Sequence, residues 1–256
     1  MDVLTKKNRK YKTVMIDWSD GYFTFLQENA PYYDYCFSCS YGPDHEKLSN
    51  VYPLCFSATN RIIDACKVYN VAYPLRTIHL FQSHRVTNHQ IRNYALHHIY
   101  SQYQSFITFF NDGFPEVSES DSFYIHWAQS GRRHNPCFYE KISQTKVMDC
   151  LGGNVHPNGT IFQIDSFKLW EAFFSGCCVL MVHLDRFGIK FPHQPINLEH
   201  YVGFTLNKEQ DLKILDDIVH GRIDTEKIAR QGKKWAEEHY TPKEFSSYIL
   251  DVLKNK

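Results

Sequence analysis

The sequence predicts an α/β fold in which a parallel sheet carries helices on both of its faces. Short apolar runs of strand length alternate along the chain with segments of helical periodicity, which is the pattern of such folds. The chain has 256 residues, of which 43% are hydrophobic, and this is ample for a buried core. We find no internal repeat and no low-complexity linker.

The first half of the chain supplies three expected strands and one long helix. Residues 12–17 (KTVMID), 76–82 (RTIHLFQ) and 105–110 (SFITFF) are short apolar runs, each of which indicates a strand. In residues 87–103 apolar side chains recur at helical spacing, which predicts a helix between the second and third strands.

The second half continues the alternation and then turns helical. We expect a short helix at 139–144, a buried strand at 146–151, a Gly-rich loop at 152–159, a helix at 166–176, and strands at 177–183 and 201–204. Three helices follow from residue 208 onward, and the last has Thr241 as N-cap with Glu244 three residues later. Parallel sheets bind ligands outside the carboxyl ends of their strands, so the chemistry is expected there.

Composition and charge exclude several classes of protein. The 28 Lys and Arg equal the 28 Asp and Glu, so no basic field points to nucleic acid. No apolar run approaches the ~20 residues of a membrane helix, and the polar start shows no secretory signal. We therefore expect a cytoplasmic protein whose 8 Cys are thiols. The CFSC segment at 36–39 lacks a second half, so we expect no zinc site.

The helix expected at 166–176, with Asp165 or Ser166 as its N-cap and Gly176 as its left-handed end, carries the principal candidate binding residues. Its aromatic side chains predict burial, yet Lys168 and Glu171 lie three residues apart on one face. This pair is either an ion pair on a solvated stripe or part of a ligand cleft. In a cleft, Glu171 would accept hydrogen bonds from vicinal hydroxyls such as those of a ribose. The free amides near Ser166, beside Lys168 and Phe167, would favour a diphosphate.

This arrangement resembles the nucleotide-sugar half of GT-B glycosyltransferases, and most of all the exostosin-type and related groups. The family pattern is Tyr, Ser and Lys before a strand, a Gly-containing loop, then Ser, a basic residue, Glu-Ala, and Gly-Cys before another strand. The matching residues are Tyr139, Ser143, Lys146, Gly152, Ser166, Lys168, Glu171, Ala172, Gly176 and Cys177. The resemblance covers about residues 76–253, including an ending (QGKKWAEEHYTPKEF) that is similar to the family's two last helices.

The resemblance implies transfer of a sugar from a nucleoside-diphosphate sugar, most often a UDP-sugar, to a hydroxyl of a glycan or glycoconjugate. It implies a reduced N-terminal, acceptor-side lobe at 1–75, a nucleotide-sugar lobe at 76–240, and a helix at 241–256 that crosses back. Glu171 would hold the ribose. The family usually has Arg where this chain has Lys168, which keeps the charge but loses the bidentate fork.

Other loops at expected strand ends supply further donor-binding candidates. Ser83, His84 and Arg85 follow a strand, in the loop that faces the donor phosphates in this fold, and Arg85 either pairs with a diphosphate or is a helix-start charge in a surface turn. Arg132, in a second basic loop, either holds phosphate or is solvated. The loop residues Gly152 and Gly153 complete the donor-binding set.

Two carboxylates at the first strand end are the catalytic candidates. Inverting transfer needs a base beside the acceptor hydroxyl, and Asp17 and Asp20 are the best placed on the N-terminal side, although Asp and Gly also form ordinary turns. Asp44, His45 and Glu46 are rivals for the same role.

Metal-independent chemistry is expected because no DxD stands at the end of an apolar strand. We expect basic side chains and helix amides to stabilise the leaving diphosphate, with no cofactor and no divalent metal. Two alternatives stay open. One is a non-catalytic nucleotide- or glycan-binding module. The other is a different α/β enzyme that acts on a phosphorylated metabolite, although GxGxxG, P-loop and GxSxG motifs are absent.

Overall fold

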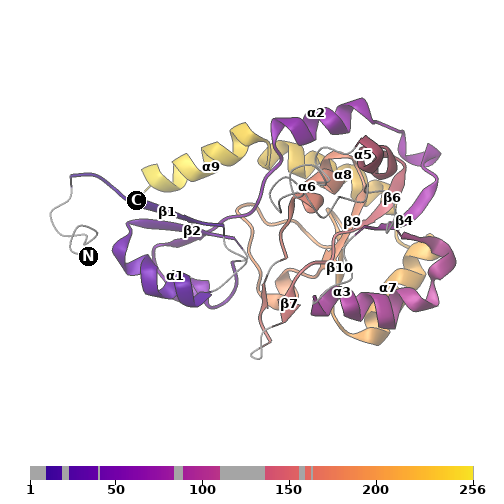
Figure 1. The fold of residues 1–256 in the computed structure, drawn as a ribbon, viewed down its shortest axis with the longest axis horizontal. Helices are drawn as coiled ribbons and strands as arrows, with labels where there is room; N and C mark the ends of the chain where they lie inside the picture. The colour runs from indigo at the N-terminus through magenta and orange to yellow at the C-terminus, as the bar shows by residue number, and fades with distance from the viewer. Residues whose placement is uncertain are drawn as a thin grey trace, which may run out of the picture.

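The computed structural model describes residues 10–18, 23–39, 41–83, 89–109, 136–155, 159–162 and 164–255. Most of its strands form two parallel sheets that lie side by side, each with its own helices (Figure 1). We call the three-stranded sheet with helix α1 the small lobe, and the five-stranded sheet with its helices the large lobe. The predicted α/β class, a parallel sheet with helices on both faces, is confirmed.

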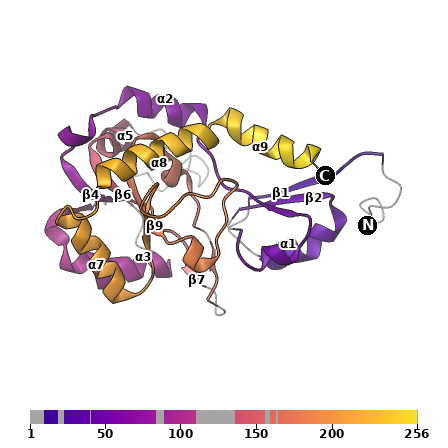
Figure 2. The ribbon, with the colours of Figure 1, turned by 180° about the vertical axis from the view of Figure 1, so that it is seen from behind.

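The small lobe has the strand order β1-β2-β3, with all three strands parallel. Its elements are β1 Val14–Asp17, α1 Phe23–Asn29, β2 Tyr35–Ser38 and β3 Val51–Pro53. The central strand β2 is buried along its whole length because α1 and the C-terminal helix α9 cover opposite faces of the sheet (Figures 1 and 2). Cys36 packs in a cluster with Leu26 of α1, and the Phe37 ring lies 6.3 Å from that of Tyr248 in α9.

The large lobe has the strand order β10-β9-β6-β4-β5, again all parallel. Its strands are β4 Ile78–Gln82, β5 Ile107–Phe109, β6 Thr145–Asp149, β9 Cys178–Val182 and β10 Val202–Phe204. These five are the strands that the sequence predicts, with shifts of one or two residues at their ends. Strand β4 pairs with β5 on one side and with β6 on the other, so the direction of winding reverses between β4 and β6.

Helices cover both faces of the large sheet (Figures 1 and 2). One face carries α2 Asn60–Val68, α5 Pro136–Ser143, α6 Phe167–Phe174 and α8 Thr225–His239, and the other carries α3 Gln90–Tyr94 and α7 Lys208–Val219. The aromatic side of α6 packs against α8 and the residue that follows it. Trp170 stacks on Tyr240 with ring centroids 4.3 Å apart, and Phe173 lies 5.2 Å from Trp235. This packing explains why α6 is so apolar.

The ends of α6 differ in part from the prediction. Gly176 follows the helix with φ +68°, the left-handed conformation expected of it. Ser166 occupies the N-cap position, but its side chain makes no capping hydrogen bond. The Asp165 carboxylate accepts hydrogen bonds from the Trp170 indole N–H and from the backbone N–H of Phe56, so it ties the helix to the segment after β3.

Two further predictions need correction. The helix expected at 87–103 is broken, because α3 passes into a π-helical segment at Ala95–Ile99 and then into short 3-10 turns. The loop expected at 152–159 contains a strand, since β7 Asn154–Val155 pairs antiparallel with β8 Ile161–Phe162. Strands β2 and β3 and helices α1 and α2 were not predicted, and β2 shows no alternation because it is buried along its whole length.

The last helix, α9 Pro242–Lys254, connects the two lobes. It begins as predicted at Thr241, whose Oγ1 accepts the backbone N–H of Glu244 at 3.3 Å. It then runs along the small sheet, where the Tyr248 hydroxyl donates to the Pro53 carbonyl at 2.9 Å and the Tyr35 hydroxyl donates to the Leu253 carbonyl at 3.5 Å. None of the described helices is both long and apolar enough to cross a bilayer.

Candidate functional site

The carboxyl ends of the two sheets face each other. The segment after β2 meets the segment after β9, where the backbone N–H of Lys190 donates to the Tyr41 carbonyl at 2.9 Å. A Cβ added to Gly188 would approach Pro43 to 2.6 Å, so these two segments are packed closely. In a sheet of this topology ligands bind outside the carboxyl ends of the strands, at the point where the winding reverses. Here that point is the end of β4 and β6.

Aromatic rings continue this junction as far as the start of α6. The Phe56 ring, after β3, lies 5.3 Å from the Trp18 ring and 4.8 Å from the Phe167 ring. Trp18 follows β1 directly and is 48% exposed, whereas Phe167 is the first residue of α6. The predicted donor-binding residue Phe167 is therefore in contact, through Phe56, with the strand end that carries Asp17.

Buried polar side chains gather at the carboxyl ends of β4 and β6. Gln82 and Ser83 end β4, and Asp149 ends β6; all three are buried. The Ser83 hydroxyl has no hydrogen-bond partner among the described residues. Buried polar groups normally have partners, so a ligand hydroxyl, phosphate or water is the natural complement here.

Lys168 lies beside Asp149. Both side chains are buried, and burial raises the pKa of Asp149 to about 6, although the positive charge of Lys168 acts in the opposite direction. Lys168 is in the first turn of α6, and the thiol of Cys150, after β6, lies 3.8 Å from its carbonyl oxygen. The predicted diphosphate-binding residue is thus at the winding reversal, where its charge is partly balanced by a carboxylate.

Glu171 is 1% exposed and lies among α2, α5 and α6. The Tyr139 hydroxyl of α5 donates to its Oε1 at 3.1 Å, and the Cys66 thiol of α2 points to its carbonyl oxygen at 3.8 Å. Burial and the nearby Glu171 carboxylate raise the pKa of Tyr139, so the phenol remains a donor. Each of these helices precedes a parallel strand and starts at the carboxyl edge of the sheet, and Glu171 lies within the first two turns of α6.

The glycines of the predicted loop follow β6 directly. Gly152 is buried, and Gly153 has φ +103°, a backbone angle that residues other than glycine rarely adopt. A Cβ on Gly153 would come within 2.7 Å of the Phe162 carbonyl oxygen, so the β7–β8 hairpin also depends on a glycine there. Ser166 is half-buried and precedes α6 as its N-cap residue. Its side chain makes no capping hydrogen bond.

Asp17 ends β1 and is buried. Its Oδ2 accepts a hydrogen bond from the Ser38 hydroxyl at 3.3 Å, and Ser38 Oγ in turn lies 3.4 Å from His45 Nε2. From the sequence, His45 was an alternative to Asp17 as the catalytic base. In the structure Ser38 connects the two side chains. The remaining rivals lie on the same loop, where Asp44 pairs with Lys47 at 2.6 Å.

Four predicted site residues lie outside the described part of the chain: Asp20, His84, Arg85 and Arg132. Asp149 and Ser38 were not predicted as site residues from the sequence, and Asp165 was expected only as an alternative N-cap of the helix. Asp149 had a usable signal, since a carboxylate at the end of an apolar run marks the carboxyl edge of a sheet. Ser38 had none, because its strand was not recognised.

Within the described ranges no group of three or more His, Cys, Asp or Glu side chains could hold a metal ion. Cys36 and Cys39 of the CFSC segment are both buried. Cys36 faces the α1 cluster on one side of β2, while Cys39 packs in the main core, so the two thiols belong to different clusters. A parallel strand places alternate side chains on opposite faces, which explains the separation.

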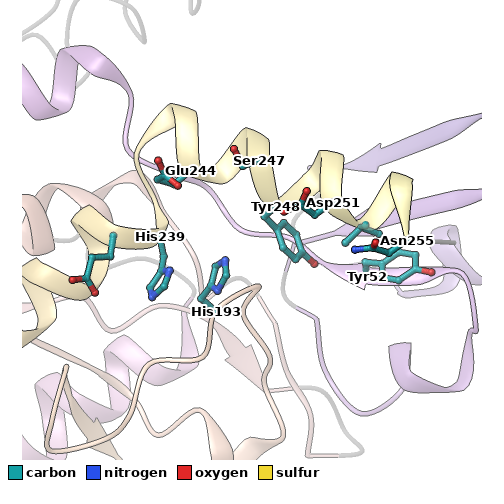
Figure 3. Close-up of a pocket in the computed structure, with 10 residues that line it drawn as sticks. Tyr52, His193, His239, Glu244, Ser247, Tyr248, Asp251 and Asn255 are labelled. Carbon is teal, nitrogen blue, oxygen red and sulfur yellow. The ribbon is translucent and has the colours of Figure 1, made fainter.

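A separate cavity of about 500 Å³ lies under α9, away from the winding reversal (Figure 3). Its lining comes from β3, α8, α9 and the segment after β9: Tyr52, His193, Glu238, His239, Glu244, Ser247, Tyr248, Asp251, Val252 and Asn255. Carboxylates and aromatic rings line it and neither Lys nor Arg does, so this cavity does not suit a diphosphate. Figure 3 shows His193 and His239 side by side at its centre.

No protein-family model matches the sequence, and no curated protein matches it. Solved structures do. An alpha-glucosyltransferase in complex with UDP-glucose and DNA containing an abasic site has a TM-score of 0.56 at 10% identity, over 99% of this chain and 75% of that protein. The same kind of enzyme with UDP and DNA containing an HMU base has a TM-score of 0.55 at 11% identity, over 99% of this chain and 74% of that one.

A TarM variant from S. aureus, in complex with Fondaparinux, alpha-GlcNAc-glycerol and UDP, has a TM-score of 0.55 at 10% identity. The similarity covers 90% of this chain but only 46% of TarM. At such low identities a likeness establishes architecture and leaves activity open. The two parallel sheets with facing carboxyl edges, joined by a C-terminal helix, have the GT-B fold of these glycosyltransferases.

Proposed function

We propose that this protein is a glycosyltransferase that moves a sugar from a UDP-sugar to a hydroxyl group. The observation that carries the proposal is the site at the carboxyl edge of the large sheet. There a cation, Lys168, lies at the winding reversal, and a buried carboxylate, Glu171, lies in the first two turns of the same helix. The positive charge of Lys168 suits a diphosphate, and the carboxylate of Glu171 can accept hydrogen bonds from a ribose diol.

The solved structures with this fold support UDP as the nucleotide. All three similar structures described above contain UDP or UDP-glucose, although their identity to this chain is 10–11%. The lobes of this chain also meet as a two-substrate enzyme requires. The donor side is α6 with β4 and β6, and the other side is the end of the small sheet with Asp17.

We further propose that transfer is inverting and independent of a divalent metal. Asp17 would take the proton of the acceptor hydroxyl, while Lys168 and the first amides of α6 would stabilise the diphosphate as it leaves. The exostosin-like assignment and the domain limits at residues 75 and 240 rest on the sequence pattern alone. Nuclear magnetic resonance of the product's anomeric carbon distinguishes inversion from retention directly.

The acceptor is proposed to be a glycan or glycoconjugate hydroxyl, because the balanced charge of the chain does not favour nucleic acid. Two of the similar structures contain DNA, so the acceptor screen includes DNA with an HMU base beside oligosaccharides. Transfer of the sugar to DNA would mean that the acceptor is not a glycan, but it would still support a UDP-sugar as the donor.

The decisive experiment measures nucleotide binding and turnover with and without Glu171. We expect UDP to raise the melting temperature more than ADP or GDP, because the similar solved structures contain UDP or UDP-glucose. Glu171→Ala should weaken UDP binding about 10- to 100-fold, since one charge-assisted hydrogen bond contributes about 1.5–3 kcal/mol. The UDP affinity of Glu171→Gln should lie between those of wild type and Glu171→Ala, because glutamine keeps the side-chain volume but loses the charge.

The matched control is Glu140→Ala, which removes an exposed carboxylate from α5 and should leave UDP affinity unchanged. Selective UDP binding without release of UDP from UDP-glucose would indicate a binding module instead of an enzyme. Preference for inorganic phosphate over UDP would point to an enzyme of phosphorylated metabolites. Equal UDP affinity of wild type and Glu171→Ala would remove Glu171 from the site.

A further inference from the structure

His45, Ser38 and Asp17 form a short chain of polar contacts at the carboxyl end of the small sheet. Asp17 and Ser38 are register partners on the adjacent parallel strands β1 and β2. Ser38 Oγ lies 3.3 Å from Asp17 Oδ2 and 3.4 Å from His45 Nε2. All three side chains are at most 5% exposed. Such a buried polar chain is unusual on a strand end unless its members satisfy one another.

The direction of donation follows from the other nitrogen of His45. The backbone N–H of Gly42 donates to His45 Nδ1 at 3.1 Å. Because an amide N–H only donates, Nδ1 carries no proton, and the hydrogen of the neutral imidazole is on Nε2. His45 is then the donor toward Ser38 Oγ. The Ser38 hydrogen has two acceptors in reach, Asp17 Oδ2 and the Cys39 carbonyl at 3.1 Å, and the carboxylate is the stronger.

The surroundings of His45 keep it neutral. Burial lowers its pKa, and the carboxylates of Asp17 and Asp44 act in the opposite direction without reversing the effect. On its own loop the Tyr41 ring packs against the imidazole with centroids 5.1 Å apart. From the strands, Asp17 and Ser38 face it. A neutral imidazole with one nitrogen bonded to an amide and the other protonated cannot itself act as a base.

We propose that His45 is a positioning residue that orients the Asp17 carboxylate, through Ser38, for deprotonation of the acceptor. This inference rests on the proposed function, in which Asp17 is the base. The acceptor oxygen forms a bond to the anomeric carbon and gives its proton to Asp17. The bond from that carbon to the β-phosphate oxygen breaks, and its electron pair leaves with UDP. Donation from Ser38 to Oδ2 fixes the orientation of the Asp17 carboxylate relative to the acceptor hydroxyl.

The test compares two substitutions of His45 in the full-length protein, with UDP-glucose as donor and water as acceptor. His45→Leu removes the donor, and we expect kcat to fall about 10-fold or more, since oriented proton transfer contributes about 10²–10⁴. His45→Gln places an N–H donor near the Nε2 position and, as the conservative replacement, should restore much of the lost kcat. The kcat of Ser38→Ala should resemble that of His45→Leu. The kcat of the double variant should be no lower than that of either single variant, because both residues act through the same contact.

Donor binding separates this inference from the proposed function. The Kd for UDP should be unchanged in His45→Leu, because His45 lies on the small lobe and Glu171 on the large one. His97→Leu, at an exposed position on the far face of the large sheet, is the control for loss of a histidine. A wild-type kcat in His45→Leu, or a kcat that His45→Gln fails to restore, would overturn this inference alone. Absence of UDP binding and turnover in the wild type would overturn the proposed function.

Discussion

Arg76 shows how a single side chain can hold several chain segments together. Its guanidinium donates to the carbonyls of Thr145 and Gly176 at 2.8 Å, of Ser175 at 2.7 Å, and of Val71 at 3.1 Å. These carbonyls belong to the start of β6, the end of α6 and the segment after α2. Arg76 thus satisfies buried acceptors on both sides of the site-bearing helix, at the end opposite to Lys168.

At the residue scale we predict that Arg76→Lys lowers the free energy of unfolding by about 2–4 kcal/mol. Lysine keeps the charge, but its ammonium cannot reach four carbonyls in different directions, and an unsatisfied buried acceptor costs about 1–3 kcal/mol. Urea denaturation followed by circular dichroism measures the loss. Arg186→Lys, at an exposed position, should change stability by less than about 0.5 kcal/mol. Equal effects of the two substitutions would contradict this role of Arg76.

At the scale of elements, histidines occupy the joint between the core and the C-terminal helices. The His193 ring stacks on His239 of α8 with centroids 4.3 Å apart, beside the cavity under α9 (Figure 3). His200 stacks on Trp235 of the same helix at 5.7 Å. Burial lowers the pKa of His193 and of His200, and the neighbouring His239 acts in the same direction on both. This joint therefore favours neutral imidazoles.

We predict that stability falls as the pH is lowered from 7.5 to 6. A histidine with a lowered pKa binds its proton less readily in the folded state than in the unfolded state, where the pKa is about 6.5. Its stabilising contribution is present above about pH 6.5 and is lost as the pH falls. Asp149, whose pKa is raised to about 6, acts in the opposite sense, because its contribution is lost as the pH rises through that value.

Melting temperatures at several pH values measure this dependence in wild type and in His193→Phe. The variant keeps a ring for stacking but cannot be protonated, so its stability should depend less on pH in this window. His97→Gln, an exposed substitution, should keep the wild-type slope. A His193→Phe slope as steep as that of wild type would mean that other groups govern the acid response.

At the scale of the whole molecule, several contacts among the described residues join the lobes. They include α9 along the small sheet, the contact between Tyr41 and Lys190, and the aromatic contact that Phe56 makes with Trp18 and Phe167. The last lies next to the proposed site, because Phe167 begins the helix that carries Lys168 and Glu171. The relative position of the lobes therefore bears directly on the distance between donor and base.

We predict that Phe56→Ala loosens the lobes at the site and leaves each lobe folded. Removing a half-buried ring should lower the free energy of unfolding by about 1–3 kcal/mol, which is less than the cost at a fully buried site. Small-angle scattering should show a larger radius of gyration, while circular dichroism stays unchanged. Phe109→Ala, on the exposed edge strand β5, is the control and should not alter the scattering. An unchanged radius in Phe56→Ala would show that the Phe56 ring does not hold the lobes together.

Much of the large lobe could be predicted from sequence because its elements are long or strongly apolar. The five strands and the helix around Glu171 were each evident from periodicity, and the Gly176 terminus followed from glycine's access to positive φ. The small lobe was harder. Its β1 was predicted, but β2 is buried on both faces and so shows no alternation. For that reason Ser38 could not be recognised as a neighbour of Asp17.

The sequence by itself determined the class of fold, the order of the large-lobe elements and the charged pair within α6, because these depend on local periodicity and on turn residues. Only the tertiary structure decided which side chains meet. It placed Lys168 beside Asp149, Glu171 beside Tyr139, and Asp17 within reach of His45. The reason is that strand order and crossover packing bring together residues that are distant in the chain, and local propensity carries no information about those pairings.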